Sequence, residues 1–388
     1  MSDELPMGWA CCRLIDANMV IAGQSPESKY YNENGDGLPF FQGKTDFGQL
    51  YPTNRVYCTA PKKVAEIGDI LLSVRAPVGP TNLAKETIAI GRGLNAIRPL
   101  GGILTRYVLY YFRQIEPVFS GQGTGTTFSA VTVDDIKNLI FPLPPLAEQH
   151  RIVAKIDALF SNLDKGVEML QTIRQQLRTY RQAVLKWAFE GCELVELGRL
   201  AEAIDPHPSH RTPPEFKGGM PYIGIRECDY STRKVNFKIA RKVSPDVLIE
   251  HVNRYTLRDG DFIIGKIGTI GKPFLIPPEQ NYTLSANIVL IQPNFEKTSK
   301  NYLYYAFQTQ GVDIQLRKTN STTQAAFGIQ RMRTLMIPLT SDDKSKQTAI
   351  VAAIESRLSV CDKLEAIIDE SLAKAEALRQ SILKKAFA

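Results

Sequence analysis

The sequence lacks the features that mark membrane, secreted and disulfide-rich proteins. Charged residues interrupt every long apolar stretch, so no segment is predicted to span a membrane. Asp3 and Glu4 stand where a secretory signal would carry basic residues before an apolar run. The six cysteines form no Cys-x-x-Cys pair and no framework spacing, which favours a reducing compartment. We therefore expect a cytoplasmic protein without membrane contact.

The motifs of several catalytic classes are also missing. Residues 265–272 approach a phosphate-binding loop, but five residues separate the outer glycines and Pro273 replaces the Ser or Thr that would hold magnesium. No Pro-Pro-aromatic step follows an Asn or Asp, as it would in an adenine methyltransferase, and no glycine-rich strand end indicates a methyl-donor site. Asp134 and Asp135 lack the basic partners of a nuclease centre, and residues 207–210 lack further metal ligands. We expect a non-catalytic chain with no cofactor or metal of its own, in which 265–272 is a turn between strands.

The sequence does contain a long internal repeat. Residues 149–189 align without a gap with residues 347–387, at a constant offset of 198 positions. A repeat of this size indicates one unit written twice, a variable block followed by a long helix. The predicted parts of the 388-residue chain are 1–141, 142–191, 192–337 and 338–388.

Charge is unevenly shared between the two variable blocks. The whole chain has a net charge of +7; block 192–337 carries five more basic than acidic side chains, whereas block 1–141 is balanced. An excess of this size permits nucleic-acid binding without demonstrating it.

The two repeat copies are predicted to be long helices. Prolines at 142–145 mark the first helix start, and Ser341–Asp343 supply a cap and acidic first-turn residues for the second. Apolar residues then recur with heptad spacing, which is typical of coiled coils. The predicted seam of the first helix contains Ile152, Ile156, Leu159, Leu163, Leu170, Leu177 and Val184, together with Gly166, Ile173, Tyr180 and Trp187. That of the second contains Ile350, Ile354, Leu364, Ile368, Leu378 and Ile382. We predict that the helices pack against each other.

The variable blocks are predicted to share a strand-rich fold. Gly68–Leu72 matches Gly260–Ile264, each an apolar strand after a Gly-Asp turn. Leu109-Tyr110-Tyr111 parallels Leu303-Tyr304-Tyr305. A common scaffold with divergent loops indicates that the two blocks present different surfaces.

The order of these parts resembles the specificity subunit of a type I restriction-modification system. The run at 142–149 (Pro-Leu-Pro-Pro-Leu-Ala-Glu-Gln) and the helix ends at 181–186 and 379–384 are similar to those of that family, although the second helix start keeps only Gln347. The resemblance covers the whole chain. It implies an α+β fold with two similar strand-rich target-recognition domains, two long antiparallel coiled-coil helices and an internal pseudo-twofold repeat.

The resemblance also implies partners. In that family, two methyltransferase subunits bind the specificity subunit and modify adenine using S-adenosylmethionine. Restriction and translocase subunits join the complex through the methyltransferase subunits. S-adenosylmethionine, ATP and magnesium are then expected on the partner subunits, and none on this chain.

Given this resemblance, we expect loops of both blocks to read duplex DNA. Basic, amide and hydroxyl side chains supply contacts to phosphates and base edges. The candidate DNA-binding residues of the first block are Lys44, Arg55, Arg75, Arg92, Gln122, Thr124, Thr126 and Thr127. Those of the second block are Arg226, Arg233, Lys234, Lys266, Lys272, Arg317, Lys318, Asn320, Thr322 and Gln324.

Two different domains predict a bipartite, asymmetric target. Half-sites on the same side of the duplex would lie about one helical turn apart, with unread bases between them. Two rival hypotheses remain: a coiled-coil assembly protein with no nucleic-acid role, and a self-contained nuclease.

Overall fold

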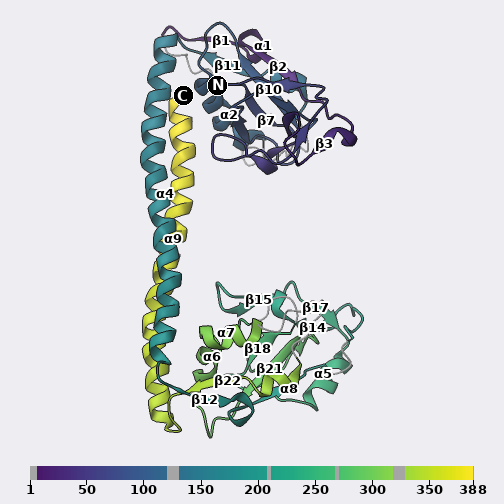
Figure 1. The fold of residues 1–388 in the computed structure, drawn as a ribbon, viewed down its shortest axis with the longest axis vertical. Coiled ribbons are helices and arrows are strands. Elements are labelled where there is room, and N and C mark those ends of the chain that lie inside the picture. Colours follow the sequence, from purple (N-terminus) through teal and green to yellow (C-terminus); the bar gives the residue numbers. More distant parts are fainter. Residues whose placement is uncertain (1–6, 120–130, 208–210, 267–270, 318–327, 388) are drawn as a thin grey trace. The chain divides into compact units, whose positions relative to one another are not determined.

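Two contact-defined units share both long helices of the chain. The computed structural model describes residues 7–119, 131–207, 211–266, 271–317 and 328–387. The first unit comprises Met1–Leu170 and Asp369–Ala388, and the second comprises Gln171–Ile368. Helices α4 (Leu146–Ala188) and α9 (Lys344–Ala386), each 43 residues long, contribute one segment to each unit (Figure 1). The units are described one at a time.

The first unit is built on a four-stranded antiparallel sheet ordered β2-β10-β7-β8. Its strands are β2 (Asn18–Ala22), β7 (Ile70–Ser73), β8 (Thr81–Leu83) and β10 (Leu94–Pro99). A second sheet, ordered β3-β5-β4-β9-β6, contains β3 (Tyr31–Asn32), β4 (Leu38–Phe41), β5 (Tyr57–Cys58), β6 (Val64–Ala65) and β9 (Ile88–Ile90). Strand β1 (Ala10–Arg13) pairs antiparallel with β11 (Ile140–Leu143). The helices of this domain are α1 (Leu14–Ala17), α2 (Thr105–Phe119) and α3 (Val133–Lys137).

The second unit repeats this plan. Its antiparallel sheet has the order β13-β21-β18-β19, with β13 (Ala201–Ile204), β18 (Phe262–Gly265), β19 (Phe274–Leu275) and β21 (Ile288–Pro293). A three-stranded sheet contains β17 (Arg241–Val243), β14 (Met220–Ile223) and β20 (Thr283–Leu284). Two pairs complete it: β12 (Glu193–Glu196) with β22 (Met336–Leu339), and β15 (Cys228–Asp229) with β16 (Lys234–Val235). The helices are α5 (Pro245–Val252), α6 (Tyr302–Ala306), α7 (Gln310–Arg317) and α8 (Ile329–Arg333).

Corresponding strands carry corresponding residues, which confirms the predicted duplication. Strands β4 and β9 pair parallel in the first unit, and β14 and β20 pair parallel in the second. The Gly-Asp turns before β7 and β18 place Gly68 and Gly260 at φ of +87° and +96°, a conformation that disfavours any residue with a Cβ. In each turn the following aspartate accepts a backbone N–H, from Glu66 to Asp69 and from Arg258 to Asp261, both at 2.8 Å.

One predicted correspondence is wrong by one residue. Tyr110 donates a hydrogen bond to Asp157, and Tyr305 donates to Glu355, which lies 198 positions after Asp157. Tyr110 therefore corresponds to Tyr305 rather than to Tyr304. Consecutive tyrosines in both blocks made the two alignments look equally good, and only the contacts with the helices distinguish them.

The long helices form part of the hydrophobic core of each unit. In the first unit, Ile156 and Phe160 of α4 and Leu383 of α9 are buried with α2 and the antiparallel sheet, and Figure 1 shows the start of α4 and the end of α9 side by side here. Arg379 lies over the Phe160 ring at 4.6 Å and pairs with Asp164. Since Leu383 lies near residues early in α4, the two segments run antiparallel within this unit.

The second unit uses the other halves of the helices in the same way. Val184 of α4 and Ile354 of α9 are buried in one core with Tyr302 of α6. Arg181 pairs with Asp362, and Arg357 lies 4.3 Å from the Trp187 ring centre. Later residues of α4 therefore meet earlier residues of α9, so these segments also run antiparallel.

Half of the predicted seam lies one residue from its true position. One predicted column of α4 (Ile156, Leu163, Leu170, Leu177 and Val184) is buried or half-buried as predicted, and so is Ile152, which begins the other column. The remaining predicted residues of the other column are exposed: Leu159, Gly166, Ile173, Tyr180 and Trp187. The residue that follows each of them is buried or half-buried instead: Phe160, Val167, Arg174, Arg181 and Ala188. The prediction for Leu159 is therefore wrong.

The same one-residue shift occurs in α9. Ile354 and Ile368 are buried and Ile350 and Ile382 half-buried, as predicted, but Leu364 and Leu378 are 40% and 51% exposed. Their places are taken by Glu365 and Arg379. Large apolar residues made the wrong column look hydrophobic, whereas the true column contains charged residues that pair with the opposite helix. The cap of α9 is Asp343, which accepts the N–H of Ser345 at 2.9 Å.

Candidate nucleic-acid interface

The predicted cations of the first unit lie on exposed loops of its recognition domain. Lys44, Arg55, Arg75 and Arg92 are all exposed. Arg55 forms an ion pair with Asp46 at 3.0 Å, so a carboxylate already lies beside its guanidinium group. The backbone N–H of Arg92 donates to Ser25 Oγ at 3.2 Å, which fixes the loop while leaving the side chain outward. These positions are compatible with phosphate contacts.

Four predicted cations of the second unit are exposed: Arg226, Lys234, Lys272 and Arg317. Arg226 lies in the turn Ile225–Glu227, and Lys234 lies in β16. The Lys272 ammonium is 5.8 Å from the Tyr230 ring centre, and the Tyr230 hydroxyl donates to the Lys272 carbonyl at 3.0 Å. Arg317, at the end of α7, pairs with Asp313 at 2.7 Å. Lys272 and Lys234 therefore offer their charge to solvent beside the β15–β16 hairpin.

Lys266 is not a surface cation, and its prediction as a DNA contact is wrong. Its side chain is 5% exposed and its ammonium pairs with Asp205 at 2.6 Å and donates to the Ala286 carbonyl at 3.2 Å. The lysine directly follows β18, whose four residues are all buried, so the chain is still inside the domain at this position. A buried ammonium that is already paired is unavailable to a phosphate.

Several predicted contacts fall outside the described residues. These are Gln122, Thr124, Thr126, Thr127, Lys318, Asn320, Thr322 and Gln324. The same holds for the middle of the run 265–272, whose ends join β18 to β19 as predicted.

The β15–β16 hairpin has a well-defined turn. Asp229 accepts hydrogen bonds from the backbone N–H of Ser231 at 2.9 Å and of Thr232 at 3.3 Å, and from both hydroxyls. Hydrogen bonds from the Ser231 and Thr232 side chains lower the pKa of Asp229 to about 2, so the carboxylate stays charged. Arg233 follows with φ of +55°, a left-handed conformation that is rare for a residue with a long side chain.

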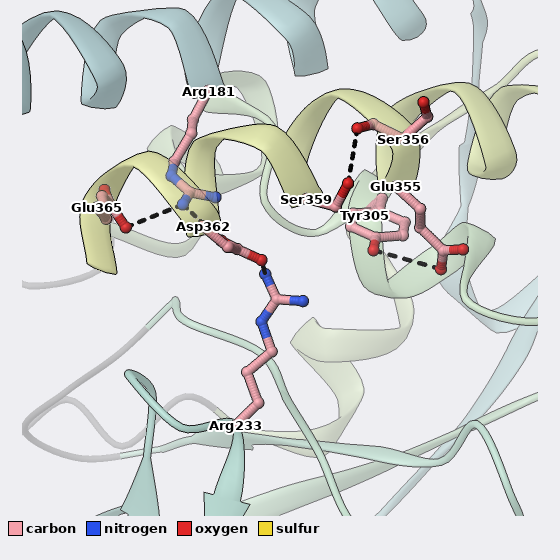
Figure 2. A network of polar contacts seen from close by, with 8 residues as sticks. All are labelled: Arg181, Arg233, Tyr305, Glu355, Ser356, Ser359, Asp362 and Glu365. Atoms are coloured by element: carbon pink, nitrogen blue, oxygen red, sulfur yellow. Dashed lines mark hydrogen bonds and ion pairs between the residues drawn. The ribbon is translucent and has the colours of Figure 1, made fainter. Parts of the chain in front are cut away.

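The side chain of Arg233 reaches α9. It donates to Asp362 Oδ2 at 2.7 Å, while Arg181 of α4 donates to Asp362 Oδ1 at 2.6 Å and to Glu365 at 2.9 Å (Figure 2). Burial opposes the charge of Arg181, but the hydrogen bonds to Asp362 and Glu365 raise its pKa. One carboxylate thus connects both helices and the recognition domain within the second unit.

The first unit has the equivalent carboxylate at Asp164. It accepts a charged hydrogen bond from Arg379 and one from Gln49 Nε2 at 3.0 Å, so here a neutral amide replaces the second arginine. The offset of 198 positions aligns Asp164 with Asp362, and Arg181 with Arg379. Their pairing was missed because both arginines fell just outside the predicted seam.

A second contact joins each domain to its helix about two turns away. Asp157 pairs with Arg106 of α2, and Glu355 accepts from Asn301, which precedes α6, at 3.1 Å. Here the arginine belongs to the first unit and the neutral amide to the second, the reverse of the arrangement at Asp164 and Asp362.

The described residues contain no group of three or more His, Cys, Asp or Glu side chains placed to hold a metal ion. Of the predicted His-rich run, His207 is buried and the following three residues lie outside the described part. Nor is any helix of the described part long and apolar enough to cross a membrane.

Comparison with known proteins identifies the family. The family described as the type I restriction modification DNA specificity domain matches residues 6–178 and again residues 190–374. The chain belongs to this family, and it contains the domain twice.

Individual relatives agree with this assignment. The putative MjaX specificity subunit of Methanocaldococcus jannaschii is 36% identical over 191 residues, covering 48% of this chain and 44% of that subunit. The EcoBI specificity subunit of Escherichia coli is 25% identical, over 67% of this chain and 61% of its own length. The chain thus spans about half the length of these relatives. The EcoKI specificity subunit of Escherichia coli is 23% identical over 433 aligned positions, covering 99% of this chain and 89% of that subunit.

Solved structures of related proteins are similar to parts or all of the chain. The HsdS subunit of Thermoanaerobacter tengcongensis is 48% identical with a TM-score of 0.38, over 42% of this chain and 39% of that one. The S subunit from M. genitalium is 16% identical with a TM-score of 0.40, over 100% and 98%.

Proposed function

We propose that this chain is the DNA-specificity subunit of a type I restriction-modification complex and catalyses no reaction itself. The observation that carries the proposal is that one specificity-domain family matches both halves of the chain. The four-stranded antiparallel sheets of the two halves have corresponding strand orders, yet the exposed cations occupy different loops. Such a pair of domains would read two different half-sites separated by bases that neither domain contacts.

The second domain supplies the stronger candidates for phosphate contacts. Lys272 presents its ammonium group next to Tyr230, Lys234 is exposed on β16, and Arg226 is exposed in the turn before β15. Each phosphate neutralised by such a group releases counterions and makes affinity depend on salt. Because DNA is the proposed ligand, we place the protein in the cytoplasm.

Partner subunits are proposed to cover apolar side chains on the helices. In the second unit Ile173, Tyr180 and Trp187 of α4 are 37%, 47% and 50% exposed, and Val360 and Ile367 of α9 are 54% and 57% exposed. Exposed apolar side chains grouped on helices are typical of interaction surfaces. We propose that two methyltransferase subunits bind the helices, that restriction subunits join through them, and that S-adenosylmethionine, ATP and magnesium bind these partners.

The test combines the chain with its methyltransferase partner and maps methylated adenines in the DNA of cells that express both. We expect one bipartite motif, and we expect exchange of residues 192–337 for another recognition domain to change one half of it. A change in both halves, or turnover of DNA by the purified chain alone with magnesium and ATP, would overturn the proposal. Binding to the partner without any methylation motif would favour an assembly role instead.

A further inference from the structure

We propose that Arg233 is a positioning residue, which anchors the β15–β16 hairpin of the second recognition domain to α9 through Asp362. Its importance for target reading rests on the proposed function, but the anchoring itself does not. The contact joins Nη2 of Arg233 to Oδ2 of Asp362 at 2.7 Å, as Figure 2 shows. Arg233 was among the predicted DNA contacts, so the inference gives this arginine a different ligand.

Both oxygens of the Asp362 carboxylate already accept hydrogen bonds, which supports the proposed anchor. Asp362 is 40% exposed and its two oxygens are occupied by two different arginines, Arg181 on Oδ1 and Arg233 on Oδ2. Arg181 is held a second time by Glu365. Arg181 of α4 thus orients the Asp362 carboxylate of α9, and this carboxylate accepts a second hydrogen bond from Arg233 of the recognition domain.

The backbone conformation of Arg233 also supports the proposed anchor. A φ of +55° costs free energy for any residue with a Cβ, and glycine would occupy the position more readily. A side-chain contact made by the arginine can offset this cost. The ion pair with Asp362 is that contact.

The repeat provides independent support. Asp164, which lies 198 positions before Asp362, also binds an arginine of the opposite helix and a side chain from its own recognition domain, Gln49. Both domains are therefore anchored at equivalent carboxylates, one through a neutral amide and one through a guanidinium. Only the contact of the second domain pairs two opposite charges, so salt should weaken it more.

Hydrogen–deuterium exchange of the full-length chain tests the anchor without DNA. The backbone N–H groups of Ser231 and Thr232 are hydrogen-bonded to Asp229 and report on the turn. We expect R233Q and D362N each to accelerate exchange of residues 228–236 several-fold, and the double variant to add little beyond either. Raising the salt concentration should accelerate exchange of residues 228–236 in the unmodified chain more than it accelerates exchange of residues 44–50, which include Gln49.

The matched control is E365Q, which removes the negative charge of the other acceptor of Arg181 and leaves the Arg233 pair in place. We expect it to leave exchange of residues 228–236 unchanged. Equal acceleration in E365Q, additive effects of R233Q and D362N, or no acceleration in either would overturn the proposal.

Binding to duplex DNA across a salt series separates the anchor from a phosphate contact. We expect K234Q to reduce the slope of log affinity against log salt by about 1, and R233Q to leave it unchanged. A slope reduced by R233Q as much as by K234Q would overturn the positioning role. Absence of any DNA binding would count against the proposed function, and the exchange result would still decide the anchor.

Discussion

Gln149 and Gln347, 198 residues apart, make the same hydrogen bonds at the starts of the two long helices. The side-chain oxygen of Gln149 accepts the Leu104 N–H at 3.0 Å, and that of Gln347 accepts the Ser299 N–H at 2.7 Å. Both amide groups also donate to a backbone carbonyl just before their own helix, at Pro144 and at Ser341. Each glutamine is buried and so joins helix and domain at a point from which water is excluded.

Replacing Gln347 by leucine should destabilise the second unit. The change leaves the half-buried Ser299 N–H and the carbonyls of Lys297 and Ser341 without this partner, at a cost of about 1–3 kcal/mol. Urea unfolding measures the loss. Gln182→Leu, at an exposed position of α4, is the control and should change stability by less than about 0.5 kcal/mol. Equal effects of the two substitutions would contradict the proposed capping role.

Phe160→Ala and Leu159→Ala should differ sharply although the residues are neighbours. Phe160 is 6% exposed, packs edge-to-face on Tyr110 and lies beneath Arg379, so its truncation should cost about 3–5 kcal/mol. Leu159 is 40% exposed and should cost much less. Thermal or urea unfolding of both variants decides which column forms the seam; a larger loss at Leu159 would restore the predicted one.

This pair illustrates what the sequence can and cannot predict. The repeat, the strand-rich blocks and one column of each helix followed from periodicity and apolar spacing. The second column did not, because Arg181 and Arg379 are polar residues whose burial depends on carboxylates supplied by the other helix. Sequence patterns score each residue by its own polarity, whereas the seam is decided by pairs.

The candidate interface shows the same limit. Exposed cations such as Lys272 were predictable from residue type, but the fate of Lys266 was not. Two residues of the same type, six positions apart, differ because Lys266 directly follows the buried strand β18 and pairs with Asp205, whereas Lys272 is exposed to solvent. Only the tertiary structure distinguishes a buried ion pair from a surface charge.

His251 should make the second unit less stable in mild acid. Burial, aided by His207 and Arg254 and opposed by Glu250, lowers its pKa to about 4 from the ordinary 6.5, and Tyr255 hydrogen-bonds its Nδ1 at 3.2 Å. The unfolded state therefore binds the proton more readily, and stability falls as the pH drops from 6.5 towards 4. The contribution is full above pH 6.5 and amounts to about 3 kcal/mol.

Urea unfolding at pH 7.5, 6 and 5 measures this effect. His251→Leu should flatten the dependence in that range, whatever it does to stability at pH 7.5. His150→Leu, at an exposed position of α4, should leave the slope unchanged. An unchanged slope in His251→Leu would mean that other groups cause the acid sensitivity.

Lys266→Met and Lys272→Met should separate folding from DNA binding. Removing the buried Lys266 ammonium breaks its ion pair with Asp205 and should cost about 3 kcal/mol of stability. Replacing the exposed Lys272 should cost less than about 0.5 kcal/mol of stability.

In a DNA titration across several salt concentrations, Lys272→Met should lower the slope of log affinity against log salt by about 1, while folded Lys266→Met should keep the original slope. The two lysines thus exchange roles between the two measurements, because one charge is neutralised inside the protein and the other is available to a phosphate. If Lys266→Met lowered the slope instead, its ammonium would have to reach DNA, and the buried pair with Asp205 could not persist in the complex.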